Sequence, residues 1–155
     1  MTTRTVLSIA LVLGACTAPP PSTTVDVEAV NALRAQVEIA ENAGNADALL
    51  ALFTDDVVIM PANSPAVVGL AAAREFVPGF FQAFAVSEQF QSQEVVITGD
   101  WAFDRGTFTE TLTSKTDSLT VTTVGKYLWL LRRSDDGAWK YARITWSPDA
   151  PPPRP

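Results

Sequence analysis

The stretch that decides the fold reads Lys126-Tyr127-Leu128-Trp129-Leu130-Leu131. Successive side chains of a strand point to opposite faces, and here both faces are apolar. We therefore expect a strand that is covered on both sides, by helices and a pocket on one side and by a dimer partner on the other. A monomer core that is filled by aromatic side chains and leaves no pocket fits the same pattern.

This strand lies within one of four segments that share the same pattern. A hydrophobic period near two and an enrichment in β-branched and aromatic residues mark the segments 90–98, 101–112, 119–132 and 138–147. Compact turn signals separate these segments at Gly99-Asp100, at 115–118 and at 135–137. The second half of the chain is therefore predicted to be a meander of antiparallel hairpins.

The first half of the chain predicts helices. Apolar residues recur at the spacing of one helix face from Val25 to Asn42, and Asn45 is expected to cap a short helix that buries residues up to Phe53. A third helix is expected over 70–77, and Pro78-Gly79 should kink or break it. Short strands are expected at 57–60 and 66–68. Helices that cover one face of a bent sheet give an α+β fold.

The amino terminus predicts export and lipidation. Arg4, the apolar run 6–13 and the small residues before Cys16 resemble a bacterial lipoprotein signal, which implies cleavage after Ala15 and a diacylglyceryl group on the Cys16 sulfur. Thr17 at the next position resembles outer-membrane sorting, so in a Gram-negative host we expect the periplasmic face of the outer membrane. Secretion with an incidental Cys16 is the alternative.

These features predict four segments. They are a signal peptide at 1–15, a lipidated Cys16 with a Pro- and Thr-rich tether at 16–24, one domain at 25–147 and a disordered Pro-rich tail at 148–155. Removal of the signal leaves 140 of the 155 residues, enough for one core. The membrane is then a partner through the lipid anchor.

Charge and composition exclude several functions. The chain has 11 Lys and Arg against 17 Asp and Glu, a formal net charge of −6, and no histidine. A nucleic acid is therefore not expected as a partner. Neither a histidine-assisted nucleophile nor an imidazole-ligated metal can be built, and lipidation occupies the single thiol, so we expect neither a metal site nor a cofactor.

Residues from Val25 to Asp149 resemble a SnoaL-like domain. The resemblance rests on the run 47–57, on Gly69 at the head of a helix, and on the segments 101–106, 125–127 and 137–143 with Trp146. Such domains belong to the nuclear transport factor 2-like superfamily, alongside ketosteroid isomerase and polyketide cyclases. The resemblance implies a cone-shaped curved sheet, mixed but mainly antiparallel, wrapped around the helices. It also implies an apolar pocket and frequent dimerisation through the sheet.

Three departures from the isomerases concern polar groups. Met60-Pro61 stands where the isomerases carry a proton-shuttling aspartate before a proline, and a thioether cannot take a proton. Val37 falls near the position of their oxyanion-stabilising tyrosine, and Ile144 replaces an acid or histidine found in many relatives. The replacement of these three polar groups by apolar residues favours ligand binding over isomerase chemistry.

The resemblance also nominates site residues. The candidates for the ligand pocket are Met60, Phe76, Phe80, Trp101, Tyr127, Trp129 and Trp146, with Asp104, Arg105 and Arg143 as polar candidates. Asp104 and Arg105 are neighbours on a strand, so only one of them can enter a pocket. Asp104 is the candidate base; alternatively, Asp104 pairs across strands and Arg105 lies over an aromatic ring. Glu94 and Glu110 are expected to be solvated strand residues.

Three functions follow from these observations. The loss of polar pocket groups favours a domain that binds a small apolar or amphipathic molecule. The alternatives are an isomerase, cyclase or hydratase that uses a pocket carboxylate such as Asp104 as base, and a dimerising interaction domain. Binding is favoured over interaction, and interaction over catalysis. A pocket that holds a buried carboxylate with a raised pKa would overturn this order.

Overall fold

The computed structural model describes residues 24–149. These residues form, in chain order, α1 (Thr24–Asn42), α2 (Ala46–Ala51), β1 (Phe53–Met60), β2 (Val67–Val68), α3 (Leu70–Ala83), β3 (Phe84–Thr98), β4 (Trp101–Ser114), β5 (Thr120–Arg133) and β6 (Trp139–Pro148). The predicted signal peptide, Cys16 and most of the tether and tail lie outside the described residues. Within 24–149, every helix is too short or too polar to cross a bilayer.

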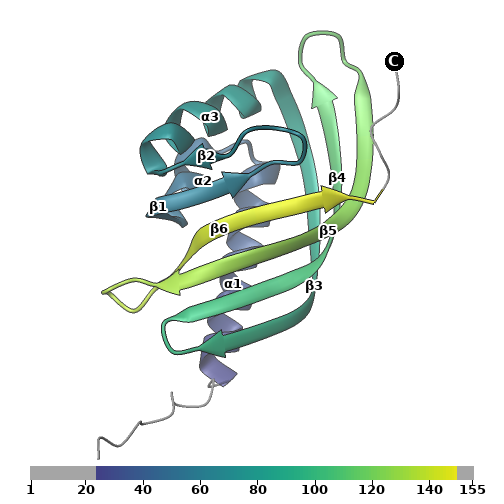
Figure 1. Ribbon diagram of the computed structural model, residues 1–155. Coiled ribbons are helices and arrows are strands. Elements are labelled where there is room, and N and C mark those ends of the chain that lie inside the picture. Colours follow the sequence, from purple (N-terminus) through teal and green to yellow (C-terminus); the bar gives the residue numbers. More distant parts are fainter. Residues whose placement is uncertain (1–23, 150–155) are drawn as a thin grey trace, which may run out of the picture.

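The strands make one curved, mixed sheet in the order β2-β1-β6-β5-β4-β3. The meander from β3 to β6 is antiparallel, as predicted, and β1 joins it by parallel pairing with β6. Figure 1 shows α1 lying across one face of the sheet, while α2 and α3 cover the end that carries β1 and β2. The fold is the predicted α+β arrangement.

α1 is fastened to the edge strand β3 by polar side chains. The Asn42 amide nitrogen donates to the Glu88 carbonyl at 3.0 Å, and the Glu88 backbone N–H donates to the Asn42 oxygen at 2.6 Å. One turn earlier, Glu38 accepts a hydrogen bond from the Phe90 N–H at 3.1 Å. These bonds use backbone groups that an edge strand would otherwise leave open, and they fix Glu88 beside the end of α1.

Two element boundaries differ from the prediction. α3 continues through Pro78 to Ala83, since Val77 and Phe81 are buried on the same helix face and their packing outweighs the hydrogen bond that proline cannot make. β3 then begins at Phe84 rather than Phe90. At the other end β6 includes Pro148, and the Asp149 N–H donates to the Val124 carbonyl, so the ordered strand passes the predicted boundary of the tail.

The two sides of β5 differ in cover. Tyr127, Trp129 and Leu131 are buried on the concave side, beneath the helices. Leu128 and Leu130 point to the convex side and keep 45% and 37% of their surface exposed. No element of residues 24–149 packs on the convex side of this strand, so the predicted cover by a dimer partner on that side stays a prediction.

Candidate functional site

The helices and the concave side of the sheet enclose a cavity of about 120 Å³. Its walls are mainly aromatic and aliphatic, and they comprise Val37, Leu49, Phe53, Ile59, Phe76, Val77, Phe80, Phe81, Phe90, Phe108, Tyr127, Trp129, Tyr141, Ile144 and Trp146. An apolar cavity of about 150 Å³ in another protein holds one benzene molecule. The cavity therefore suits a ligand of about one ring.

Three glutamates complete the wall of this cavity. Glu88 on β3 and Glu110 on β4 face each other directly across the two strands, and Glu41 joins them from the last turns of α1. Glu88 is only 4% exposed, and its Oε1 atom is buried without a hydrogen-bond partner. Among the described residues that line the cavity, none is a lysine or an arginine. The carboxyl groups therefore have no cationic partner in the wall.

Burial and mutual repulsion keep protons on these groups. Burial, assisted by the charges of Glu41, Glu110 and Glu38, raises the pKa of Glu88 to about 9. Burial, with Glu110 and Glu38, raises the pKa of Glu41 to about 8, and burial also raises the pKa of Glu110. Like charges placed directly opposite on neighbouring strands repel each other. At neutral pH Glu88 and Glu41 therefore present neutral carboxyl groups to the cavity, and such groups can both donate and accept hydrogen bonds.

Tyr141 adds a fourth polar group to the wall. Its side chain is 1% exposed and lines the cavity, and its hydroxyl oxygen is buried without a partner. Burial raises the pKa of the phenol well above its usual value, so the group remains a neutral hydroxyl. Buried polar atoms are nearly always hydrogen-bonded in folded proteins. The open positions on Glu88 and Tyr141 point to a ligand with hydrogen-bonding capacity.

Asp104 lies outside the cavity wall and is fully paired. Its carboxylate is 1% exposed, forms an ion pair with Arg34 at 2.6 Å, and accepts hydrogen bonds from the Ser92 hydroxyl at 2.6 Å and the Tyr127 hydroxyl at 3.2 Å. These bonds hold α1 against the sheet and orient Tyr127, whose ring stacks on Trp129 with centroids 4.0 Å apart. The hypothesis of Asp104 as a pocket base is wrong, because its acceptor positions serve the scaffold.

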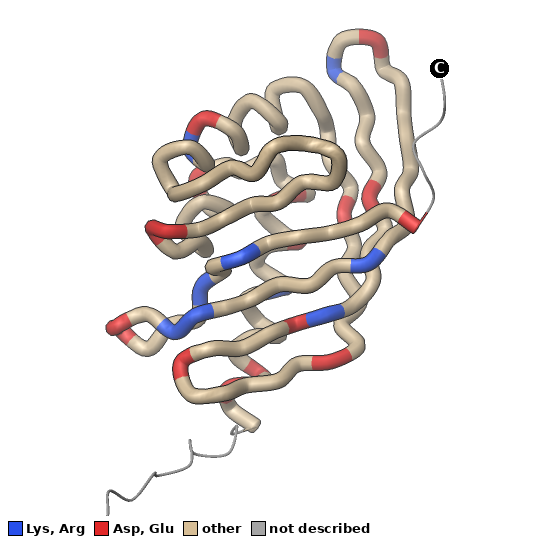
Figure 2. Tube along the Cα trace, in the orientation of Figure 1, with Lys and Arg blue, Asp and Glu red and all other residues tan. Residues whose placement is uncertain are grey.

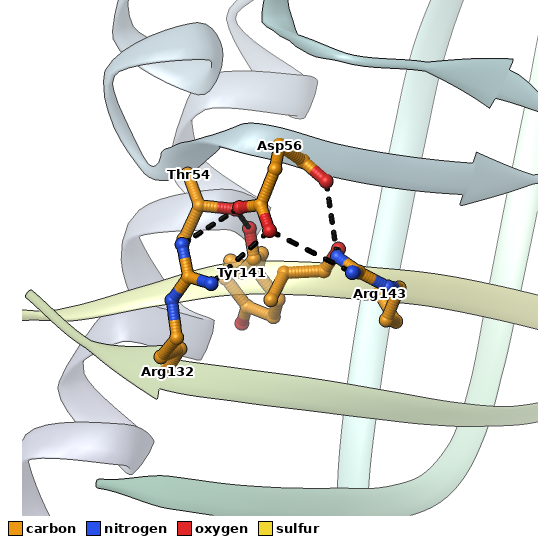
Figure 3. Close-up of polar contacts among 6 residues, drawn as sticks. Thr54, Asp56, Arg132, Tyr141 and Arg143 are labelled. Carbon is orange, nitrogen blue, oxygen red and sulfur yellow. Dashed lines mark hydrogen bonds and ion pairs between the residues drawn. The ribbon is translucent and has the colours of Figure 1, made fainter.

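Both arginine candidates point to the convex side of the sheet. Arg105 pairs with Glu94 at 2.5 Å, so the alternative of Arg105 over an aromatic ring is also wrong. Figure 3 shows Arg143 and Arg132 meeting at Asp56, where Arg143 donates to the backbone carbonyl at 3.0 Å and Arg132 to the carboxylate at 2.7 Å. Figure 2 shows basic residues along β4, β5 and β6. The three arginines stabilise strand contacts and do not line the pocket.

Five of the seven predicted apolar candidates line the cavity, namely Phe76, Phe80, Tyr127, Trp129 and Trp146. Met60 and Trp101 do not. Met60 stands opposite Thr145 and is exposed, while its neighbour Ile59 turns into the cavity. Trp101 is exposed at the rim of the sheet, where the Arg132 guanidinium lies 5.6 Å from its ring. Alternation along each strand places both side chains on the convex side.

Sequence reasoning missed the glutamate cluster, although its signal was available. Glu88 has the same strand parity as Phe90, and Glu110 the same parity as Phe108, so each acid shares a face with a pocket aromatic. The expectation that Glu110 is solvated is wrong for this reason. Glu41 follows buried Val37 by four residues, which puts both on one face of α1.

The fold and the cavity define a class of protein. Three helices packed against a curved mixed sheet, with a mainly apolar cavity between them, constitute the nuclear transport factor 2-like α+β cone. The sequence profile of the SnoaL-like domain matches residues 33–142, and the chain belongs to the SnoaL-like domain family.

Solved structures agree with this assignment. A ketosteroid isomerase-like protein from Erwinia carotovora atroseptica is 30% identical, superposes with a TM-score of 0.76, and covers 83% of this chain and 100% of its own. A nuclear transport factor 2-like superfamily protein from Salmonella enterica, 12% identical, superposes with a TM-score of 0.72 over 84% of this chain and 96% of its own, and so shares the fold. A search of proteins with curated functions found no match.

Proposed function

We propose that this chain is a lipid-anchored envelope protein whose SnoaL-like domain binds a small, mainly apolar molecule carrying at least one hydrogen-bonding group. The observation that carries the proposal is the cavity itself, with aromatic walls and three carboxyl groups beside an unpartnered tyrosine hydroxyl. Apolar walls with a few placed polar groups are the usual composition of small-molecule sites.

Tryptophan fluorescence of the full chain tests the binding proposal. Trp129 and Trp146 line the cavity, so titration with a one-ring probe such as 2-phenylethanol should change their emission. The matched variants are Trp101→Phe, which removes a tryptophan outside the cavity and should keep the response, and Trp146→Phe, which should reduce it. Native mass spectrometry after gentle extraction should also show a bound small molecule. A chain that binds no probe and carries no molecule would contradict the proposal.

The anchoring part of the proposal rests on Cys16 and the segment before it. Replacement Cys16→Ser removes the only thiol that can carry a diacylglyceryl group, so the protein should leave the membrane fraction. Ser22→Ala, in the predicted tether, is the control and should leave the distribution unchanged. A Cys16→Ser protein that stays with the membrane would exclude the lipid anchor.

Acid–base catalysis is the second candidate, because Glu88 and Glu41 are pocket carboxyl groups with raised pKa values, and such groups are frequent at catalytic sites. A neutral carboxyl group can donate a hydrogen bond to a carbonyl oxygen and stabilise an enolate. Binding stands first because burial holds protons on Glu88 and Glu41 at neutral pH, and a protonated carboxyl group cannot act as a base. Deuterium exchange at the α-carbon of a small cyclic ketone, followed by NMR, tests the candidate; exchange abolished in Glu88→Gln would favour catalysis.

A second copy of the chain is the proposed occupant of the convex face. Leu128 and Leu130 are exposed there on β5, and Val96 is exposed on β3, with β4 between the two strands. Sedimentation should show a dimer that Leu130→Arg dissociates. A wild-type chain that sediments as a monomer at high concentration would remove this part of the proposal.

A further inference from the structure

We infer that the molecule held in the cavity is an organic cation, an ammonium group on an apolar body of about one ring. The inference rests on the proposed function, since it specifies the chemistry of the ligand that the same cavity binds. The juxtaposition of three carboxyl groups with aromatic walls carries it.

The carboxyl groups supply the first element of a cation site. Glu41, Glu88 and Glu110 reach the cavity from α1, β3 and β4, and the buried Oε1 atom of Glu88 accepts no hydrogen bond. An ammonium N–H donated to this oxygen would form a charge-assisted hydrogen bond, which is about twice as strong as a neutral one. The unpartnered Tyr141 hydroxyl, which is independent of the acidic cluster, can accept a second N–H.

The aromatic walls supply the second element. Phe90 packs edge-on against Trp129 with ring centroids 4.7 Å apart, and Tyr127 stacks on the same indole. Trp146 stands opposite Tyr127 on β6 and also lines the cavity. The negative faces of tryptophan and tyrosine rings attract ammonium groups, and the attraction increases when water is excluded.

The charges around the cavity disfavour other ligands. The nearby Arg34 is engaged by Asp104, and Lys115 donates to the Phe81 carbonyl at 2.7 Å, so neither is free to neutralise an anion. Among the described residues, no group of histidine, cysteine, aspartate and glutamate side chains has the arrangement of a metal site. Hard metal ions require about six oxygen ligands, whereas an ammonium group requires only a few acceptors and ring faces.

Cation binding in this cavity is coupled to proton release. The charges that act on Glu88 are those of Glu41 and Glu38 from α1 and Glu110 from β4. The ionisable groups that share the cavity wall with it from the other strands are Tyr127 on β5 and Tyr141 on β6. Burial holds protons on Glu88 and Glu41, and an entering cation stabilises a charged carboxylate. One acid therefore loses its proton when the cation binds. At pH values below the pKa of that acid, affinity should therefore increase about tenfold for each unit by which the pH is raised.

Titration calorimetry of the full chain with phenethylamine and 2-phenylethanol tests the inference. Both probes have one ring, and the amine is cationic from pH 6 to pH 8 because alkylamines have a pKa near about 10. We expect the amine to bind at least tenfold more tightly than the alcohol at pH 8. We also expect its affinity to fall about 100-fold at pH 6 and about one proton to be released, as measured in buffers of different ionisation enthalpy.

Matched variants test whether the cavity glutamates cause the preference for the amine over the alcohol. Glu88→Gln and, separately, Glu110→Gln should reduce the preference for the amine, and near-ultraviolet circular dichroism checks that each variant folds. Glu94→Gln, on the convex side of β3, should bind as the wild type does. Equal affinity for both probes without proton release would overturn the inference and leave the proposed function standing. A chain that binds neither probe would contradict both.

Discussion

Replacement of Glu88 by glutamine should stabilise the protein at neutral pH. The pKa of this carboxyl group rises from its ordinary value of 4.5 to about 9 because the folded chain buries it beside Glu41 and Glu110. Between these two pH values the folded protein holds a proton that the unfolded chain has lost. The free energy of unfolding therefore decreases as the pH rises through this window.

The magnitude follows from the width of the window. The pH of 7 is about 2.5 units above the ordinary pKa of a glutamate side chain, and each unit changes the free energy of unfolding by about 1.4 kcal/mol. Ionisation of the unfolded chain thus lowers the stability of the wild type by about 3 kcal/mol at pH 7, and by less than about 1 kcal/mol at pH 5. Glutamine is neutral in both states and is free of this dependence.

Urea denaturation at pH 5 and pH 7 measures the effect. The free energy of unfolding of Glu88→Gln relative to wild type should increase by about 2 kcal/mol or more between the two pH values, whatever constant change the amide introduces. Glu75→Gln, at an exposed position on α3, is the control and should show no such increase. A difference that does not change with pH would show that Glu88 is ionised in the folded protein and would refute the reasoning.

Further expectations concern the scaffold and can be tested by urea denaturation and sedimentation. Asp104→Asn breaks a buried ion pair and should cost about 3 kcal/mol or more, whereas Glu94→Gln, in an exposed pair, should cost less than about 1 kcal/mol. Gly106→Ala places a methyl group 2.7 Å from the Tyr127 hydroxyl and against the β3 backbone, and should cost more than about 2 kcal/mol. Gly79→Ala, in α3 with open space around it, should stabilise by up to about 1 kcal/mol. Leu130→Arg should leave the stability of the monomer within about 0.5 kcal/mol while removing the proposed dimer.

The elements of this fold were predictable because their signals are local. The strand period and the turns predict the meander, and the Asn45 cap is confirmed by a 3.0 Å hydrogen bond from the Ala48 N–H to its side chain. The continuation of α3 through Pro78 was not predictable from the residues nearby. It depends on the burial of Val77 and Phe81 in a core to which residues outside α3 contribute.

The candidate site was predictable only in its apolar part. A strand pattern tells which residues share a face, and it correctly grouped Tyr127 with Trp129. It does not tell which face is covered by α1, and this cover decides that Asp104 meets Arg34 while Glu88 meets other acids. The role of each carboxyl group therefore depends on its partner in another element, which a single sequence does not reveal.

The contrast between two buried acids identifies the part of the interior that serves a ligand. Asp104 is as deeply buried as Glu88, yet an arginine and two hydroxyl groups satisfy it, as a scaffold requires. Glu88 has an open acceptor, lies among like charges, and lowers stability at neutral pH. Gln in its place would keep the shape of the wall and avoid this cost. Because the chain retains the destabilising group where a cavity adjoins it, we infer that the carboxyl group acts on what the cavity holds.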